Sequence, residues 1–258
     1  MSASCASRAG SNRRAARRSR GPNRRSSPPK QERVKPLGIL MLDTRFPRIE
    51  GDIGNPASFD FPVIYQRLEG IGPADAVAAH PDRPRLMAAL EANARKLAAA
   101  GASGIATSCG FLALFQKELE AVSPVPVATS ALLLIPALKD RKVGVITASA
   151  RHLTGRHLAA VGAPEDTLVQ GMPEDGAFAA TFLCDTPHLD RDAVERETIE
   201  AGRALLQGNP GLDAIVLECT NLPPYRQALQ MALGVEVYDV RDLLRDFWQR
   251  LASGVERG

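Results

Sequence analysis

One pattern of residues occurs twice in this chain of 258 residues, about 110 positions apart. GASGIATSCGF (101–111) aligns with GLDAIVLECTN (211–221), and the alignment places Cys109 on Cys219. In each copy an apolar run ends two residues before the cysteine, and a helical stretch precedes the run. Two further pairs match at similar spacing: VPVATSALLL (125–134) with VEVYDVRDLL (235–244), and GILMLDTR (38–45) with GVITASAR (144–151). These matches predict that one structural unit is present twice.

Short apolar runs alternate with alanine- and leucine-rich stretches of helical length throughout residues 37–258. The run Ala214–Leu217 is typical of a strand that is buried on both faces of a parallel sheet. Alternation of such strands with helices predicts an α/β fold with helices on both faces of its parallel sheets. The expected strands are 38–42, 104–107, 125–128, 143–146 and 214–217, and the expected helices include 85–100 and 192–207.

Residues 1–36 differ in composition from the rest of the chain. They contain eleven Lys and Arg residues and one acid, a formal charge of +10, so the remaining residues carry −7 of the chain's +3. A segment with so few large apolar side chains is expected to be a disordered basic tail. We interpret it as a solvated extension or an early start codon, in preference to a nucleic-acid arm or a transit peptide. No apolar stretch approaches a membrane span, so a cytoplasmic protein is expected.

The four cysteines are expected to be thiols because no secretory signal precedes them. No Cys-x-x-Cys or His-x-x-x-His spacing supports a metal site, and the four histidines are interpreted as ordinary surface or core residues. Cys5 and Cys184 have no equivalent in the other copy, and we expect them to be structural.

The equivalent cysteines, Cys109 and Cys219, stand where ligands bind in open parallel sheets, at the carboxyl ends of strands. A helix is expected directly after each, and its N-terminus would stabilise a thiolate against an ordinary thiol pKa of about 8.5. Free cysteines often only pack in the core. Two thiols that face each other across a cleft could instead remove a proton from one face of a carbon and return it to the other.

Both cysteine segments, with LDTRFP after the first strand and ITAS in the second copy, resemble the aspartate/glutamate racemase superfamily, which includes hydantoin racemases. The resemblance covers about residues 37–250. It implies two pseudo-symmetric α/β lobes with the active site in the cleft between them, Cys109 and Cys219 as acid and base, and no cofactor. It also implies that the strand after each cysteine helix crosses into the other lobe. The lobes are then 37–122 plus 232–258, and 123–231.

The same logic predicts residues that bind the substrate at the strand ends and in the long loop of residues 45–61. Hydroxyls and N–H groups there could bind a carboxylate, although such residues are also ordinary caps and turns. Long loops at strand ends are often functional lids. Arg48 in this loop could reach a carboxylate, but we prefer to interpret Arg48 as an exposed charge. The predicted binding residues are Asp43, Thr44, Asn55, Ser108, Gly110, Phe111, Thr147, Ser149, Thr220 and Asn221.

Two positions depart from the pattern of aspartate and glutamate racemases. Gly110-Phe111 stands where Asn-Thr usually follows the first cysteine, and Glu218 stands where Gly usually precedes the second. The first departure favours a hydantoin-like or apolar substrate over an acidic amino acid. The resemblance therefore predicts a cofactor-independent racemase or epimerase of an amino acid or a derivative.

The alternatives are a maleate-type cis–trans isomerase with a cysteine nucleophile and a small-molecule-binding protein without turnover. A related decarboxylase is less favoured, because such relatives keep one cysteine of the pair. The expected partner is a small molecule, neither a nucleic acid nor a membrane, with a homodimer left open.

Overall fold

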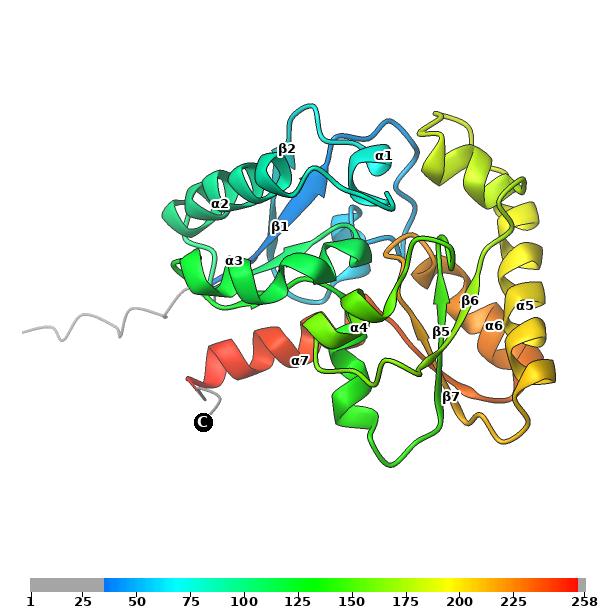
Figure 1. The fold of residues 1–258 in the computed structure, drawn as a ribbon. Coiled ribbons are helices and arrows are strands. Elements are labelled where there is room, and N and C mark those ends of the chain that lie inside the picture. Colours follow the sequence, from blue (N-terminus) through cyan, green and yellow to red (C-terminus); the bar gives the residue numbers. More distant parts are fainter. Residues whose placement is uncertain (1–34, 255–258) are drawn as a thin grey trace, which may run out of the picture. The chain divides into compact units, whose positions relative to one another are not determined.

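The computed structural model describes residues 35–254, which contain two four-stranded parallel sheets (Figure 1). The first sheet has the order β2-β1-β3-β4 and the second has the order β6-β5-β7-β8. The α/β prediction is therefore confirmed. The basic tail predicted over residues 1–36 lies almost wholly outside the described residues. The strands are β1 (Leu37–Leu42), β2 (Val63–Leu68), β3 (Gly104–Thr107), β4 (Val127–Ala128), β5 (Val143–Thr147), β6 (Leu168–Gly171), β7 (Ala214–Leu217) and β8 (Glu236–Tyr238).

The two sheets repeat each other in strand order and in packing. β1 and β5 are equivalent central strands, and each pairs with the strand that precedes its cysteine. Gly38 in β1 lies against Leu97, and Gly144 in β5 lies against Leu205, so that a side chain at either glycine would collide with a helix. Both close approaches require glycine for the same reason, which supports the doubling predicted from the sequence.

Helices cover both faces of the first sheet, as the alternation predicts. In the first sheet Gly38 faces α2 (Arg83–Ala99), whereas Gly104 on the other face lies against Phe247 and Leu251 of α7 (Val240–Ser253). On the second sheet, helices α5 (Arg191–Gly208) and α6 (Arg226–Leu233) pack against each other, and α5 also packs against β6. The remaining helices are α1 (Pro73–Ala76), α3 (Gln116–Val122) and α4 (Gly155–Ala160).

The exchange between lobes differs from the expected one. β4 pairs with β3 and β8 pairs with β7, so neither strand crosses into the other sheet. The following segments make the crossing instead: α7 packs on β3 and β4, and the helical segment η3 (Ala131–Leu138) packs on β7. The prediction that the strands cross is wrong, because each strand completes its own ladder before the chain leaves the lobe.

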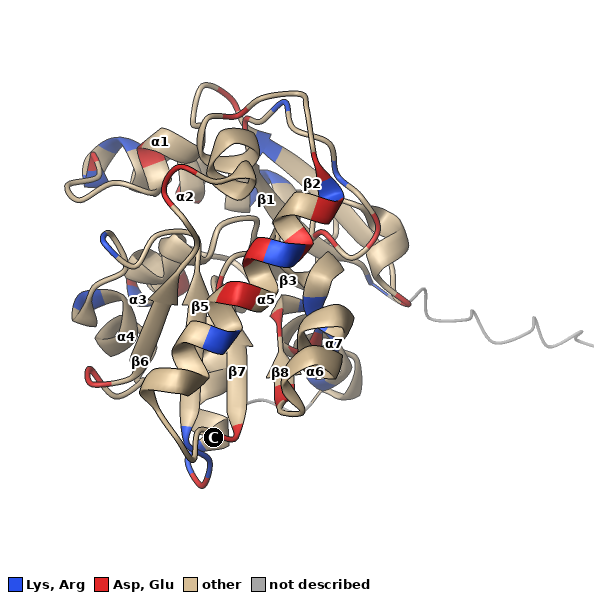
Figure 2. Cartoon of the chain, turned by 90° about the vertical axis from the view of Figure 1, so that its right-hand side faces the viewer, with Lys and Arg blue, Asp and Glu red and all other residues tan. Residues whose placement is uncertain are grey.

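Helix α5 illustrates how the surface of this body is built. Val194, Ala201 and Leu205 of α5 are buried, whereas its acidic and basic positions, coloured along the helix in Figure 2, are exposed or half-buried. That division is typical of a helix that covers a sheet and faces water. None of the described helices is long and apolar enough to cross a membrane.

Candidate active site

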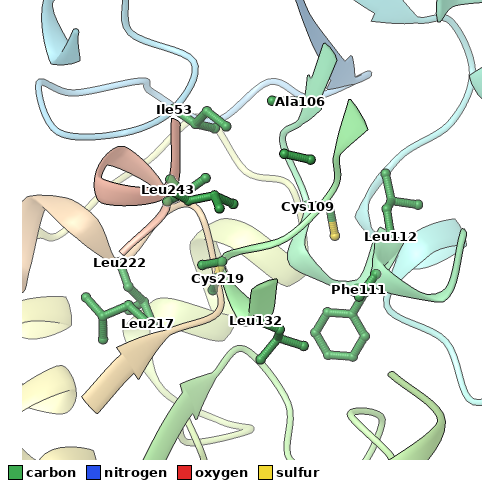
Figure 3. Packing of buried hydrophobic residues seen from close by; sticks show 14 of the residues in the cluster. Ile53, Ala106, Cys109, Phe111, Leu112, Leu132, Leu217, Cys219, Leu222 and Leu243 are labelled. Atoms are coloured by element: carbon green, nitrogen blue, oxygen red, sulfur yellow. The ribbon is translucent and has the colours of Figure 1, made fainter. Parts of the chain in front are cut away.

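The two cysteine loops lie directly against each other at the carboxyl ends of β3 and β7 (Figure 3). Thr220 Oγ1 donates a hydrogen bond of 2.6 Å to the carbonyl oxygen of Ser108. Gly110 is pressed against Glu218, because a Cβ at Gly110 would collide with the carboxyl group and the carbonyl oxygen of Glu218. The two departures from the racemase pattern therefore lie in contact, and the missing side chain at one position leaves space for the other.

Each cysteine begins the same turn. The N–H of Leu112 donates to the carbonyl of Cys109, and the N–H of Leu222 donates to the carbonyl of Cys219, both at 3.1 Å. Short 3-10 turns follow, η2 (Gly110–Phe115) and η5 (Pro223–Tyr225), before α3 and α6 begin. An α-helix therefore does not start directly at either cysteine, contrary to the sequence prediction.

Both cysteines line one cavity, and each is 8% exposed. The cavity volume is about 30 Å³, room for one or two water molecules, so the site is closed in this conformation. Its wall is mostly apolar, with a few polar groups near the sulfurs. The lining residues are Leu42, Thr44, Phe46, Arg48, Pro73, Val77, Ser108, Cys109, Gly110, Phe111, Ala148, Phe178, Phe182, Leu183, Glu218, Cys219, Thr220 and Asn221.

Burial raises the pKa of both thiols, which is the opposite of the stabilised thiolate expected from the sequence. The pKa of Cys109 is raised to about 12, first by burial and then by the negative charge of Glu218. The backbone N–H groups of Phe111 and Leu112 lower the pKa, but by less. Burial and Glu218 also raise the pKa of Cys219. Desolvation therefore outweighs the backbone dipoles here, and both thiols are protonated at neutral pH.

Glu218 lies fully buried beside the cysteines. Thr147 Oγ1 donates a hydrogen bond of 2.7 Å to Glu218 Oε2, whereas Glu218 Oε1 has no partner among the described residues. Burial raises the pKa of Glu218 to about 7, against the opposing effect of the bonds from Thr147 and the backbone of Ala148. The carboxyl group therefore changes its charge close to neutral pH.

A chain of polar contacts connects the long loop after β1 to Cys219. Arg48 Nη1 lies 2.9 Å from Asp52 Oδ1, and Asn221 Nδ2 donates to Asp52 Oδ2 at 2.7 Å. Cys219 Sγ lies 3.6 Å from Asn221 Oδ1. The Arg48 side chain is only 16% exposed, so the interpretation of Arg48 as an exposed loop charge is wrong. Its pairing with Asp52 and Thr44 holds it at the cavity wall.

Aromatic side chains from both lobes close the cavity on another side. Phe46 meets Phe182 edge to face at 4.9 Å, and Phe178 packs on Phe182 at the same centroid distance. Outside this contact the backbone N–H of Arg45 donates to Asp185 Oδ1 at 2.6 Å, and its guanidinium lies 3.2 Å from Asp185 Oδ2. The segment 176–185, which we call the lid, is thereby fastened to the opposite lobe.

Six of the ten predicted binding residues line the cavity with the two cysteines: Thr44, Ser108, Gly110, Phe111, Thr220 and Asn221. Four do not. Asp43 pairs with Arg67 and accepts from Gly70, and Asn55 caps a short turn, so both side chains serve local structure. Thr147 donates a hydrogen bond to Glu218, and the Ser149 hydroxyl is hydrogen-bonded to the ring of His152.

Several residues of the site were not predicted from the sequence. Asp52 has no motif of its own, and its contact with Asn221 spans 169 positions. Phe178 and Phe182 belong to an alanine-rich stretch that gives no sign of facing a cavity, and the neighbouring Cys184, expected to be structural, is exposed. Among the described residues no group of three or more His, Cys, Asp or Glu side chains is arranged to hold a metal ion.

The chain matches a known protein family. A family model described as Asp/Glu/Hydantoin racemase matches residues 71–244, and the chain belongs to this family. Its curated relatives include a dimethylsulfoniopropionate lyase from Durusdinium sp. clade D, 29% identical over 237 residues that cover 84% of this chain and 76% of the relative. Dimethylsulfoniopropionate lyase 5 from Emiliania huxleyi (strain CCMP1516) is also 29% identical, and the match covers 83% of this chain and 45% of that enzyme.

Solved structures share the fold at low sequence identity. Unliganded arylmalonate decarboxylase matches with a TM-score of 0.55 and 17% identity over 86% of this chain and 94% of its own. Aspartate racemase from Picrophilus torridus matches with a TM-score of 0.51 and 14% identity over 85% of this chain and 94% of its own. The two-sheet architecture is therefore that of racemases and of a decarboxylase alike.

Proposed function

We propose that this protein is a cofactor-independent enzyme that removes the proton from the carbon next to a carboxyl group, with Cys109 and Cys219 as base and acid. One observation carries the proposal: thiols from equivalent positions of the two halves line the same closed cavity. Membership of the Asp/Glu/Hydantoin racemase family supports it.

Racemisation or epimerisation of an amino acid or a derivative is the reaction that two such thiols suit best. One cysteine, as thiolate, takes the α-proton, and the electron pair of the broken C–H bond stays on the substrate as a carbanion. The other thiol then gives its proton to the opposite face, so that one proton is removed and one is returned. A thiolate whose thiol has a raised pKa is a strong base, which suits a weakly acidic carbon once the thiolate has formed.

The apolar wall supports a hydantoin-like or apolar substrate over aspartate or glutamate. The cation that lines the cavity, Arg48, is already paired with Asp52. A second carboxylate on the substrate would therefore lie among phenylalanine rings without a free positive partner, and burying such a charge is unfavourable.

Elimination from a β-sulfonium carboxylate is the second candidate, favoured by the dimethylsulfoniopropionate lyases among the relatives. A thiolate would take the α-proton, the C–H electron pair would form the C=C bond, and the C–S bond would break, leaving dimethyl sulfide and acrylate. The rings of Phe46, Phe178 and Phe182 line the cavity and suit a cationic sulfonium group. This reaction needs one base and no return of the proton to carbon.

A substrate screen in deuterium oxide tests the proposal. Purified protein is incubated with aspartate, glutamate, 5-substituted hydantoins and dimethylsulfoniopropionate, followed by chiral chromatography, mass spectrometry and headspace detection of dimethyl sulfide. A racemase incorporates α-deuterium and loses activity in both Cys109→Ser and Cys219→Ser. A lyase releases dimethyl sulfide and depends on the thiol that serves as base.

Cys184→Ser is the matched control and should keep full activity, because Cys184 is exposed and does not line the cavity. Full activity in both Cys109→Ser and Cys219→Ser would refute the proposal. A stable thiol adduct on a maleate-like substrate would identify a cis–trans isomerase instead. Binding without deuterium exchange or adduct would identify a binding protein.

A further inference from the structure

The carboxyl group of Glu218 has a place in the cavity that the two-thiol scheme leaves unexplained. It lines the cavity, precedes Cys219 in the chain and packs against Gly110, the residue after Cys109. A substrate carbon between the two sulfurs would therefore lie beside this carboxyl group. Its Oε1 atom is fully buried and has no hydrogen-bond partner within residues 35–254.

An ionised carboxylate with an unpaired oxygen is costly in such surroundings, and the neutral acid costs less. Thr147 donates to Oε2, which makes that oxygen an acceptor and assigns the acid proton to Oε1. Burial raises the pKa of Glu218 to about 7, which agrees with a neutral form below neutrality. The proton on Oε1 is then a hydrogen-bond donor with no acceptor in the described part of the chain.

Most other donors around the cavity already have partners. The N–H of Leu112 donates to the carbonyl oxygen of Cys109, and Thr220 Oγ1 donates to the carbonyl oxygen of Ser108. Arg48 is held by Asp52 and Thr44. The hydroxyl of Thr44 accepts from Arg48, and the hydroxyl of Ser108 accepts from the backbone N–H of Leu42. Both hydroxyls belong to the first lobe.

Removal of an α-proton moves negative charge onto the neighbouring carboxyl or carbonyl oxygen, and that oxygen needs a donor in a dry site. We propose that Glu218 is a catalytic residue which, as a neutral carboxylic acid, donates a hydrogen bond from Oε1 to this substrate oxygen. The inference rests on the proposed function and extends it to the stabilisation of the intermediate. It also gives Gly110 a role, because a side chain there would displace the carboxyl group.

The charged and titratable groups that face Glu218 define how its protonation responds to pH. They are the two thiols, and the Arg48–Asp52 pair on the long loop. His157 lies behind Phe111, and burial lowers its pKa to about 4, so it is neutral near pH 7. Ionised Glu218 raises the pKa of both thiols, so the neutral acid also makes a thiolate easier to form.

Infrared spectroscopy of the ligand-free protein tests the protonation state without any substrate. The spectrum of wild type minus Glu218→Gln should contain a protonated carboxyl band at pH 5.5 that is lost with a midpoint near pH 7. Glu236→Gln is the matched control, because Glu236 is a surface carboxylate paired with Arg141 and should show no such band. Absence of the band at pH 5.5 in wild type overturns the inference, whether or not a substrate has been found.

Turnover of whichever substrate passes the screen tests the donor role. In Glu218→Gln the hydroxyl of Thr147 fixes the amide oxygen at the place of Oε2, so the NH2 group takes the place of Oε1 and still donates. We expect kcat within about tenfold of wild type for this variant, and no alkaline loss near pH 7. Glu218→Leu has no donor and should lose about 100- to 1000-fold in kcat with a smaller change in KM.

Two outcomes of this comparison overturn the inference. One is a Glu218→Leu enzyme that keeps kcat within tenfold of wild type. The other is a Glu218→Gln enzyme as slow as Glu218→Leu, which would mean that Glu218 must exchange its proton. Circular dichroism and thermal unfolding establish that each variant is folded. A failed substrate screen counts against the proposed function alone, since the infrared result does not depend on it.

Discussion

Thr220 Oγ1 lies 2.6 Å from the carbonyl oxygen of Ser108, and this one bond joins the residue after the second cysteine to the residue before the first. Both partners are buried, and Thr220 is 1% exposed. The backbone carbonyl of Thr220 also accepts from Ile53 in the long loop at 3.4 Å. The relative position of the two sulfurs is therefore braced by side chain and backbone together.

Thr220→Val should weaken this brace without changing the shape of the side chain. It leaves a buried carbonyl without its donor, so we expect a loss of about 1–3 kcal/mol in the free energy of unfolding, measured by urea denaturation. The matched control is Thr167→Val, which removes an exposed bond of 2.6 Å to Pro164 and should change stability by less than about 0.5 kcal/mol. Equal effects of both variants would contradict the brace.

The fastening of the lid to Arg45 should govern how often the cavity opens. Arg45→Ala removes the two guanidinium bonds to Asp185, and exposed pairs of this kind are worth up to about 1 kcal/mol. Amide hydrogen exchange in the lid, residues 176–185, should become up to about fivefold faster. Arg95→Ala, which breaks an exposed pair with Glu91, should leave that segment unchanged. Unchanged exchange in Arg45→Ala would show that the aromatic contacts alone hold the lid.

The raised thiol pKa values predict uneven alkylation. With the pKa of Cys109 at about 12, roughly one molecule in ten thousand carries its thiolate at pH 8. Exposed Cys184 should therefore react with iodoacetamide roughly a thousandfold faster than Cys109, as read from peptide masses over time. Unfolding in urea should equalise the rates. Rapid labelling of Cys109 in the folded protein would disprove the raised pKa.

Glu218 should make the folded state less stable as pH rises. Burial raises its pKa from 4.5 to about 7, so the folded protein binds the proton more tightly than the unfolded chain between these values. Stability is then lost from about pH 4.5 to pH 7, by up to about 3 kcal/mol. Urea denaturation at pH 5 and pH 8 should show this difference in wild type and a smaller one in Glu218→Gln. An equal difference in both proteins would show that Glu218 does not cause the loss of stability.

Local sequence patterns predict much of the fold. The short, mainly apolar run before each cysteine predicts a buried parallel strand, and the structure has β3 and β7 there. Doubling predicts that Cys109 and Cys219 occupy equivalent places, and they stand in identical turns. β2 and β6 were not predicted, because VIYQRL and LVQG mix polar and apolar residues on strands whose side chains are mostly half-buried.

The parts of the site that escaped prediction depend on contacts between distant segments. Nothing near Asp52 in the chain indicates that it meets Asn221, and nothing near Phe182 indicates that it meets Phe46. The raised pKa of Cys109 is a consequence of burial and of Glu218, which a local view of helix ends does not include. Sequence patterns thus predict where strands end, whereas the pKa values of the thiols depend on side chains that the other lobe contributes to the same cavity.

The doubling is a symmetry of the backbone and does not extend to the hydrogen bonds of the sulfurs. The backbone N–H groups of Phe111 and Leu112 lie near Cys109, whereas Cys219 has the N–H of Asn221, with the side-chain amide of Asn221 and the carboxylate of Asp52 beside it. Left and right faces of a bound molecule would thus meet bases of different strength. In a racemase built this way the two enantiomers would show unequal kinetic isotope effects, although the equilibrium between them stays at one to one.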